Sequence, residues 1–144
     1  MEQFDRTDTK YDVKIVDALH HYIAVSYHRN GTSGKSQWTI SVPDEISVFT
    51  WGMSNKFKID NKCWGLFLND KKTEVVGLLT NNEESRIARF VCGTSDSTWH
   101  GYPADYKRAI GDIPTDEILR IWVSKSYISK SKMLKIQQQK PCGL

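Results

Sequence analysis

Short stretches of alternating apolar and polar residues dominate the chain before residue 93, and this spacing is typical of β-strands. Residues 22–28 and 37–42 are rich in β-branched and aromatic side chains. The segment 30–36 between them holds asparagine, glycine and serine, which tolerate turn conformations. We therefore expect a β-hairpin here, whose second strand ends at Pro43 because proline has no N–H for the sheet ladder.

A second hairpin is predicted further along the chain. Residues 63–68 and 73–79 are strand-like apolar runs, and the polar segment 69–72 between them has the composition of a turn. Residues 47–51 and 56–59 add two shorter strand-like pieces between the two hairpins.

Residues 86–92 form the last expected strand, with Ile87 and Arg89 on one face and Ala88 and Phe90 on the other. The connections between successive strands are too short for a parallel crossover, which takes a dozen or more residues. The pattern therefore predicts an antiparallel β-meander of about five to six strands with two hairpins.

The apolar residues of the N-terminal segment 10–21 fit both the period of a helix and the period of a strand. Ile15 and Leu19 are spaced as on one face of a helix, whereas Tyr11, Val13 and Ile15 alternate as in a strand. The helical spacing is slightly favoured, so we expect one N-terminal helix before the meander.

The C-terminal part carries helix signals. The segment 93–113 is punctuated by glycine and proline, and we interpret it as a long loop. Thr115 then precedes two acids that suit the first turn of a helix over 116–125. Apolar residues cover most of this helix, so it should be largely buried. Ser129 is expected to cap a second helix that ends near Lys140.

The second C-terminal helix is expected to have two different faces. The inward face comprises Met133, Leu134, Ile136 and Gln137, and the outward face carries Lys132, Lys135 and Gln139. Two consecutive helices of this kind form either an αα-hairpin packed on the sheet or a helix-turn-helix, whose second helix would contact phosphates and bases.

Together these elements predict a single α+β domain over residues 1–144, in which the antiparallel β-meander is followed by a C-terminal αα-hairpin. The β-rich body covers about 11–92, the long loop 93–113 and the helical C-terminus 114–140. Five Trp, six Tyr and five Phe give enough apolar area for a core and exclude a disordered chain.

Charge is distributed unevenly along the chain. The total is +3, but residues 118–144 carry six cations and no acid, which leaves −3 on the preceding 117 residues. A basic tail on a mildly acidic body suits a polyanionic partner such as nucleic acid. The ordinary alternative is that cations near helix C-termini complement the helix dipole.

The sequence also predicts a cytoplasmic location without membrane contact. Residues 1–12 contain no apolar stretch of the signal-peptide type, and no apolar run approaches the ~20 residues of a membrane helix. The three cysteines are too widely spaced for a disulfide framework or a metal motif, so reduced thiols are expected.

The segment 31–36 ends in Gly-Lys-Ser, as a phosphate-binding loop does. Such a loop needs glycine where this chain has Arg29, and it needs a following helix where residues 37–42 predict a strand. A hairpin turn is therefore the better interpretation, and no cofactor is expected.

The most distinctive segment begins at residue 98 and reads Thr-Trp-His-Gly-Tyr-Pro-Ala-Asp-Tyr-Lys-Arg. Within the expected loop, three aromatic rings would stack on bases while two cations hold phosphates. These five residues are Trp99, Tyr102, Tyr106, Lys107 and Arg108. The alternative is that the rings anchor the loop by burial in the core.

Histidines supply the candidate chemistry. His100 lies in the same segment, and its imidazole titrates near physiological pH, so it suits general acid or base catalysis. With His28 as a second imidazole and Lys107 or Arg108 as the cation, three groups would suffice for metal-independent RNA cleavage. The alternative is a structural role for the histidines. Their spacing lacks the close ligand pairs of a zinc site, so no metal is expected.

Two classes of function follow from these patterns. The first is a small binding or regulatory protein, antitoxin- or immunity-like, that binds another protein or contacts RNA or DNA. Its contacts would be Lys132 and Lys135 on the basic C-terminal helix, together with the aromatic–basic segment. The second is a toxin-type ribonuclease with His100, His28 and Lys107 as catalytic residues. The sequence contains no complete catalytic cluster, which favours the binding protein.

Overall fold

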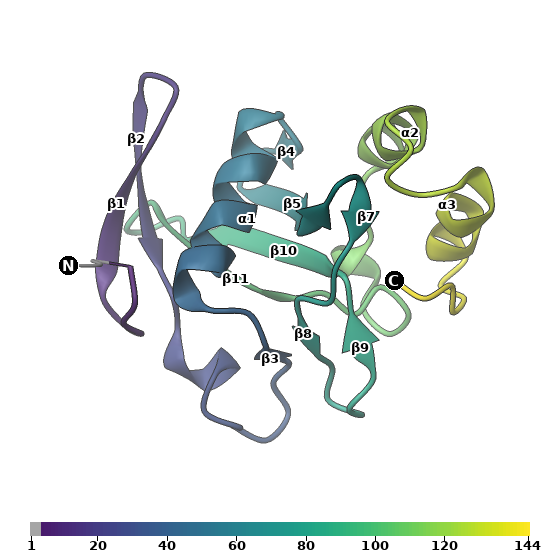
Figure 1. The fold of residues 1–144 in the computed structure, drawn as a ribbon. Helices are drawn as coiled ribbons and strands as arrows, with labels where there is room; N and C mark the ends of the chain where they lie inside the picture. The colour runs from purple at the N-terminus through teal and green to yellow at the C-terminus, as the bar shows by residue number, and fades with distance from the viewer. Residues whose placement is uncertain (1–3) are drawn as a thin grey trace.

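A six-stranded sheet lies at the centre of the computed structural model, which describes residues 4–144 (Figure 1). The strand order is β1-β2-β11-β10-β5-β4, and neighbouring strands are antiparallel except β2 and β11, which are parallel. The strands of this sheet are β1 (Lys10–Ile15), β2 (Ala18–Ile23), β4 (Lys58–Ile59), β5 (Lys62–Leu66), β10 (Ile87–Cys92) and β11 (Thr98–Pro103).

Smaller sheets and helices surround this sheet. One small sheet has the order β3-β8-β9, and another pairs β6 with β7. Their strands are β3 (Gln37–Trp38), β6 (Leu68–Asn69), β7 (Lys72–Thr73), β8 (Gly77–Leu78) and β9 (Glu84–Ser85). The helices are η1 (Ser26–His28), α1 (Val42–Ser54), η2 (Ile110–Asp112), α2 (Asp116–Ser124) and α3 (Lys130–Gln137), where η denotes a 3₁₀-helix. In Figure 1, α1 lies across the sheet, and α2 and α3 lie together towards the C-terminus.

The combination of helices and antiparallel sheet confirms the α+β class. Two helix starts are confirmed as well, because the Thr115 side chain caps α2 and the Ser129 side chain caps α3. Met133 and Ile136 face the core as expected, but Leu134 is 43% exposed. None of the helices within residues 4–144 has both the length and the apolar character that crossing a bilayer requires.

The predicted N-terminal helix is wrong, because this segment is the hairpin β1–β2. Tyr11, Val13 and Ile15 are buried while the residues between them are exposed, so the period of two was the correct signal. Val16 begins the turn with a φ of 56° and stays 80% exposed. Leu19, which with Ile15 had the helical spacing, is also exposed.

The strand predicted at 37–42 is shortened to β3, and the strand predicted at 47–51 is replaced by helix α1. The strand predicted at 56–59 is shortened to β4. The Ser41 side chain accepts a hydrogen bond from the backbone N–H of Asp44, and Pro43 lies in the first turn, where the N–H that proline lacks is not needed. Residues 47–51 are therefore helical. Of their side chains, Val48 and Phe49 are buried against the sheet, whereas Trp51 is partly buried.

Neither predicted hairpin forms as expected. The strand expected at 22–28 ends at Ile23 and continues into η1, and β3 pairs with β8 instead. In the second hairpin, β5 pairs with β4 and β10, β8 pairs with β3 and β9, and only the tip survives as β6–β7. The loop residues have the turn composition that was recognised, but distant segments provide the strand partners.

The antiparallel meander and the long loop at 93–113 also need correction. Residues 98–103 form β11, a central strand that pairs with β10 on one side and runs parallel to β2 on the other. The parallel pair joins segments far apart in sequence, so the short connections gave no sign of it. Glycine and proline inside the strand had indicated a loop.

Two clusters of buried side chains hold the layers together. The first lies between α1 and the sheet and contains the fully buried Tyr22, Phe49 and Phe90. The second packs β5 and β10 against α2 and α3, with Ile87 and Trp122 fully buried. Within β10, Ile87 belongs to the second cluster whereas Ala88 and Phe90 belong to the first, in agreement with the alternation expected for these residues.

The packing around Gly101 explains why a glycine occupies this position in a central strand. Gly101 lies opposite Phe90 in the β10–β11 pair. A Cβ added at Gly101 would lie 2.2 Å from Cδ1 of Phe90, closer than any non-bonded contact allows. The buried aromatic ring therefore occupies the space that a side chain at residue 101 would need.

We expect Gly101→Ala to destabilise the fold by about 1–3 kcal/mol, the usual cost of overpacking a core. Gly111→Ala is the matched control, because its new Cβ would meet only the Arg89 guanidinium at 3.7 Å. Urea unfolding should place the control within about 0.5 kcal/mol of the wild type. Equal losses in the two variants would contradict the proposed role of the Phe90 ring.

Candidate functional site

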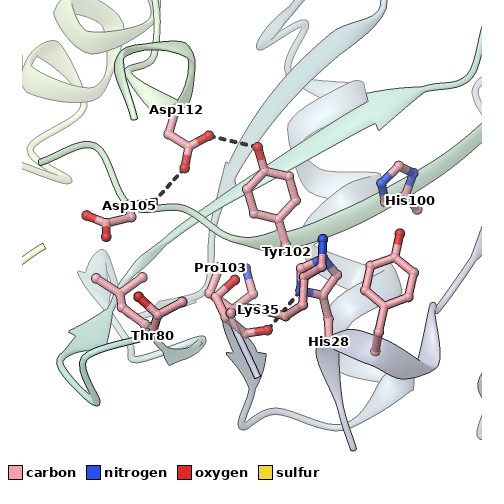
Figure 2. A pocket seen from close by; sticks show the side chains of 12 residues that line it. His28, Lys35, Thr80, His100, Tyr102, Pro103, Asp105 and Asp112 are labelled. Carbon is pink, nitrogen blue, oxygen red and sulfur yellow. Dashed lines mark hydrogen bonds between the residues drawn. The ribbon is translucent and has the colours of Figure 1, made fainter. Parts of the chain in front are cut away.

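A cavity of about 310 Å³ opens between η1, the loop that precedes β3, and the face of β11 that carries His100 (Figure 2). Its volume falls in the range of small-molecule sites. The lining residues are Tyr27, His28, Gly34, Lys35, Ser36, Leu79, Thr80, His100, Tyr102, Pro103, Asp105 and Asp112. Two imidazoles, a lysine and two tyrosines thus meet at one surface.

Strand alternation explains why two of these side chains share the cavity. His100 and Tyr102 are two positions apart on β11 and point to the same face of the sheet, whereas Trp99 joins the core on the α1 side. In the neighbouring strand β10, Arg89 lies opposite Tyr102.

Tyr102 is held in place by a buried carboxylate. Its hydroxyl donates to Oδ1 of Asp112 at 2.7 Å and accepts from Nη1 of Arg89 at 2.6 Å. Oδ2 of Asp112 accepts from the backbone N–H of Asp105 at 2.8 Å (Figure 2). Burial, followed by the nearby Asp112 charge, raises the pKa of Tyr102 to about 12. Tyr102 therefore stays protonated and forms a fixed wall of the cavity.

His28 stacks on this wall. The His28 and Tyr102 rings have centroids 5.4 Å apart and planes inclined by 18°. Nδ1 of His28 lies 2.8 Å from the carbonyl oxygen of Ser36. Since a carbonyl only accepts, Nδ1 must carry the proton, and in the neutral ring Nε2 keeps its lone pair. Within residues 4–144, Nε2 of His28 has no hydrogen-bond partner.

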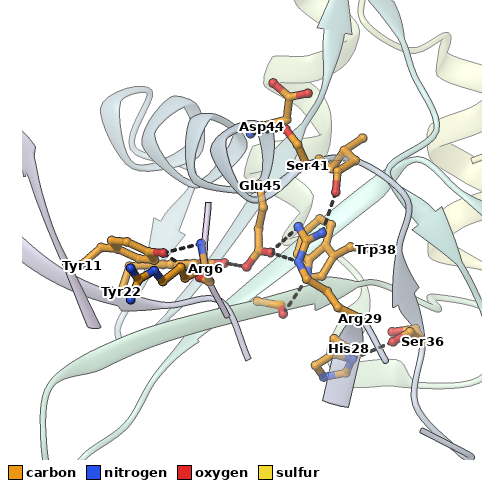
Figure 3. Close-up of polar contacts among 12 residues, drawn as sticks. Arg6, Tyr11, Tyr22, His28, Arg29, Ser36, Trp38, Ser41, Asp44 and Glu45 are labelled. Carbon is orange, nitrogen blue, oxygen red and sulfur yellow. Dashed lines mark hydrogen bonds and ion pairs between the residues drawn. The ribbon is translucent and has the colours of Figure 1, made fainter. Parts of the chain in front are cut away.

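A buried ion pair fixes the segment that carries His28. Figure 3 shows Glu45 of α1 reaching Tyr22 on one side and Arg29 on the other. Nη2 of Arg29 donates to Oε1 of Glu45 at 2.8 Å, and Nη1 donates to the carbonyl of Ile40, also at 2.8 Å. Because Arg29 follows His28 directly, these contacts anchor the end of η1 beside the cavity.

Both cavity histidines favour the neutral form. Burial is the largest cause that lowers the pKa of His28 below 6.5, and it is also the largest cause for His100. The Arg89 charge lowers the pKa of His100 further, and the Lys35 charge contributes to lowering both. Two neutral imidazoles beside a cation are suited to moving protons at mildly acidic pH.

The remaining walls offer contacts to a ligand. Nζ of Lys35 lies 5.2 Å from the centroid of the Tyr27 ring, and its side chain is exposed. Asp105 also lines the cavity, and its Oδ1 is buried without a hydrogen-bond partner in the described part of the chain.

The predicted aromatic and basic residues separate into different environments. Of the rings, only Tyr102 lines the cavity, whereas Trp99 and Tyr106 are buried in the two core clusters. Lys107 does not line it, and its Nζ lies 2.7 Å from Oε1 of Glu83. Arg108 pairs with Asp105 at 3.2 Å. The alternative of rings anchored by burial therefore describes Trp99 and Tyr106.

Lys132 and Lys135 lie apart from this cavity, on α3. Lys135 is exposed, and Lys132 is partly buried in a second cavity that is described below. The histidine cavity thus receives none of its positive charge from the C-terminal helix.

Lys35 and Tyr27 are site residues that the sequence did not indicate. The Gly-Lys-Ser segment is followed by strand β3, and its lysine lines the cavity. The one available signal was local: Tyr27 and His28 stand just before this glycine-rich segment, and loops held by a scaffold often carry function.

Comparison with known proteins gives no information about the function of this chain. No known protein family, curated protein or solved structure gives a significant match to this chain. Within residues 4–144, no group of three or more His, Cys, Asp or Glu side chains is arranged to hold a metal ion.

We expect the His28 and His100 imidazoles to titrate below pH 6.5 in a ¹H–¹³C NMR experiment. Lys35→Gln should raise both pKa values, because it removes a positive charge that disfavours the protonated rings. Lys58→Gln is the control, since the Lys58 charge acts on His20 instead. Unchanged titration in Lys35→Gln would show that Lys35 does not face the two rings.

Proposed function

We propose that this protein binds RNA and cleaves it by metal-independent transesterification in the cavity of His28 and His100. The observation that carries the proposal is that these two imidazoles and Lys35 line the same cavity. RNA cleavage of this type needs a base for the 2′-hydroxyl, an acid for the leaving oxygen and a cation for the phosphorane. Lys35 takes the part that the sequence suggested for Lys107.

The proposed reaction uses the 2′-hydroxyl of the substrate as nucleophile. His28 removes its proton, and O2′ forms a bond to phosphorus. The bond from phosphorus to O5′ breaks, and O5′ takes a proton from the His100 imidazolium. The products are a 2′,3′-cyclic phosphate and a 5′-hydroxyl, and exchange with solvent restores both imidazoles.

The hydrogen bonding of the two rings supports this assignment of roles. The Ser36 carbonyl holds the proton of His28 on Nδ1 and leaves Nε2 basic, which suits the general base. The His100 ring has no hydrogen-bond partner within the described residues, so it is free to turn towards a leaving group.

The walls of the cavity support a nucleic-acid substrate. Tyr27 lines the cavity with a partly exposed ring of the kind on which bases stack. Lys132 and Lys135 of α3, in the αα-hairpin proposed for the C-terminal helices, would hold the RNA backbone outside the cavity.

His100→Ala should lower the cleavage rate of a labelled oligoribonucleotide by 10²–10⁴, about what a general acid contributes. His28→Asn should cause a similar loss, because the asparagine amide can still donate to the Ser36 carbonyl but cannot act as a base. Mass spectrometry should find a 2′,3′-cyclic phosphate with the wild type, and cleavage should persist in EDTA.

His20→Ala is the matched control for both variants, because His20 lies on β2 and does not line the cavity. It should cleave at the wild-type rate. A 2′-O-methyl substrate should not be cleaved at all. The proposal fails if His100→Ala, with a melting temperature near that of the wild type, retains full activity.

The pH profile of kcat/KM should be bell-shaped with its maximum below pH 6.5. His100 must be protonated and His28 neutral, and both pKa values are lowered by burial. Above the maximum the rate should fall about tenfold per pH unit, because the acid loses its proton. Lys35→Gln should move the profile to higher pH, and a maximum above pH 7.5 in the wild type would contradict the assignment.

A further inference from the structure

A second cavity, of about 420 Å³, lies between the β6–β7 turn and α3 and shares no lining residue with the histidine cavity. Four of its eight lining residues are cations, and none is an acid. The cations are Lys71, Lys72, Arg86 and Lys132, which we call the basic cluster, and the other lining residues are Thr73, Ser126, Tyr127 and Gly143.

Three separate parts of the chain bring these cations together. Lys71 and Lys72 come from the tight turn of the β6–β7 hairpin, where Asp70 and Lys71 both have positive φ. Arg86 lies between β9 and β10, and its Nη1 donates to the carbonyl of Thr73. Lys132 is in the first turn of α3. The cluster is therefore a product of tertiary folding.

The basic cluster lacks neutralising partners. Within residues 4–144, none of its four side chains forms an ion pair, although other cations such as Lys107 and Arg29 do. The first turn of α3 contains no acid, unlike that of α2. A lysine at this position faces the positive end of the helix dipole. Like charges gathered at such a place repel one another, and an anion would relieve the repulsion.

The geometry points to a phosphate-binding site for the backbone of an RNA strand, an inference that rests on the proposed ribonuclease function for the identity of the ligand. Lysine binds phosphate as a point charge, and the guanidinium of Arg86 can add a directed contact. Tyr127 is the only ring among the lining residues, so the cavity is suited to phosphates rather than to bases. A strand reaching from the histidine cavity would gain affinity here without regard to its sequence.

The test measures binding of a single-stranded 2′-O-methyl oligonucleotide, which cannot be cleaved by attack of O2′, by fluorescence anisotropy at several salt concentrations. Each phosphate contact contributes about 0.7 to the slope of log K against log salt for single strands. Lys72→Ala/Lys132→Ala should therefore lower the slope by about 1.4. Neither lysine has an ion-pair partner in the described chain, so the variant should fold, which circular dichroism can verify.

Lys125→Ala/Lys130→Ala is the matched control, because it removes two exposed lysines of the same C-terminal region that do not line the cavity. It should leave the slope within about 0.3 of the wild type, well below the loss expected for two contacts. Equal losses in the two double variants would overturn the inference and indicate diffuse attraction to net charge. An unchanged slope in Lys72→Ala/Lys132→Ala would overturn it as well.

Two further measurements distinguish a failure of the phosphate-site inference from a failure of the proposed ribonuclease function. Binding to the uncleavable strand does not depend on catalysis, so a salt-slope difference without any RNA cleavage would support the phosphate site and overturn only the ribonuclease. Binding of inorganic tripolyphosphate tests whether the site takes a free phosphate anion instead of the RNA backbone. If Lys72→Ala/Lys132→Ala loses tripolyphosphate binding but keeps the wild-type slope for the oligonucleotide, the site serves a free anion and RNA is excluded as its ligand.

Discussion

The carboxylate of Glu45 is fully buried, and the arrangement of the surrounding segments depends on its partners. Burial raises the pKa of Glu45 to about 7, against the opposing effects of the hydrogen bonds from Tyr22 and Arg29. An unpaired charge at this position would cost several kcal/mol, so the carboxylate and the guanidinium require each other. The pair thereby joins three segments: β2 through Tyr22, α1 through Glu45 and the end of η1 through Arg29.

The contact between Glu45 and Arg29 also positions the candidate site, because one peptide bond joins Arg29 to His28. His28 precedes Arg29, and its ring is then held between the Ser36 carbonyl and the Tyr102 ring. On the opposite wall, Asp112 holds Tyr102 through its hydroxyl. The two walls of the cavity are thus each fixed by a buried carboxylate, which is a rigid arrangement of the kind that acid–base chemistry requires.

In the proposed function the two cavities have different roles. The histidine cavity would supply proton transfer, whereas the basic cluster would supply positive charge for phosphates. Their lining residues are separate, so their contributions can be removed independently. Charge on the C-terminal helix would then serve affinity, and it would do so at a distance from the reacting atoms.

The sequence alone determined the local features: the α+β class, the caps at Thr115 and Ser129, and the alternation along β10, because each depends on neighbouring residues. It also singled out His28 and His100 as a possible pair. Only the tertiary structure decided which strands pair, that residues 98–103 form a central strand, and that Lys35 rather than Lys107 joins the histidines. The physical reason is that strand pairing and cavity walls join segments far apart in the chain, whereas capping and periodicity act within a few residues.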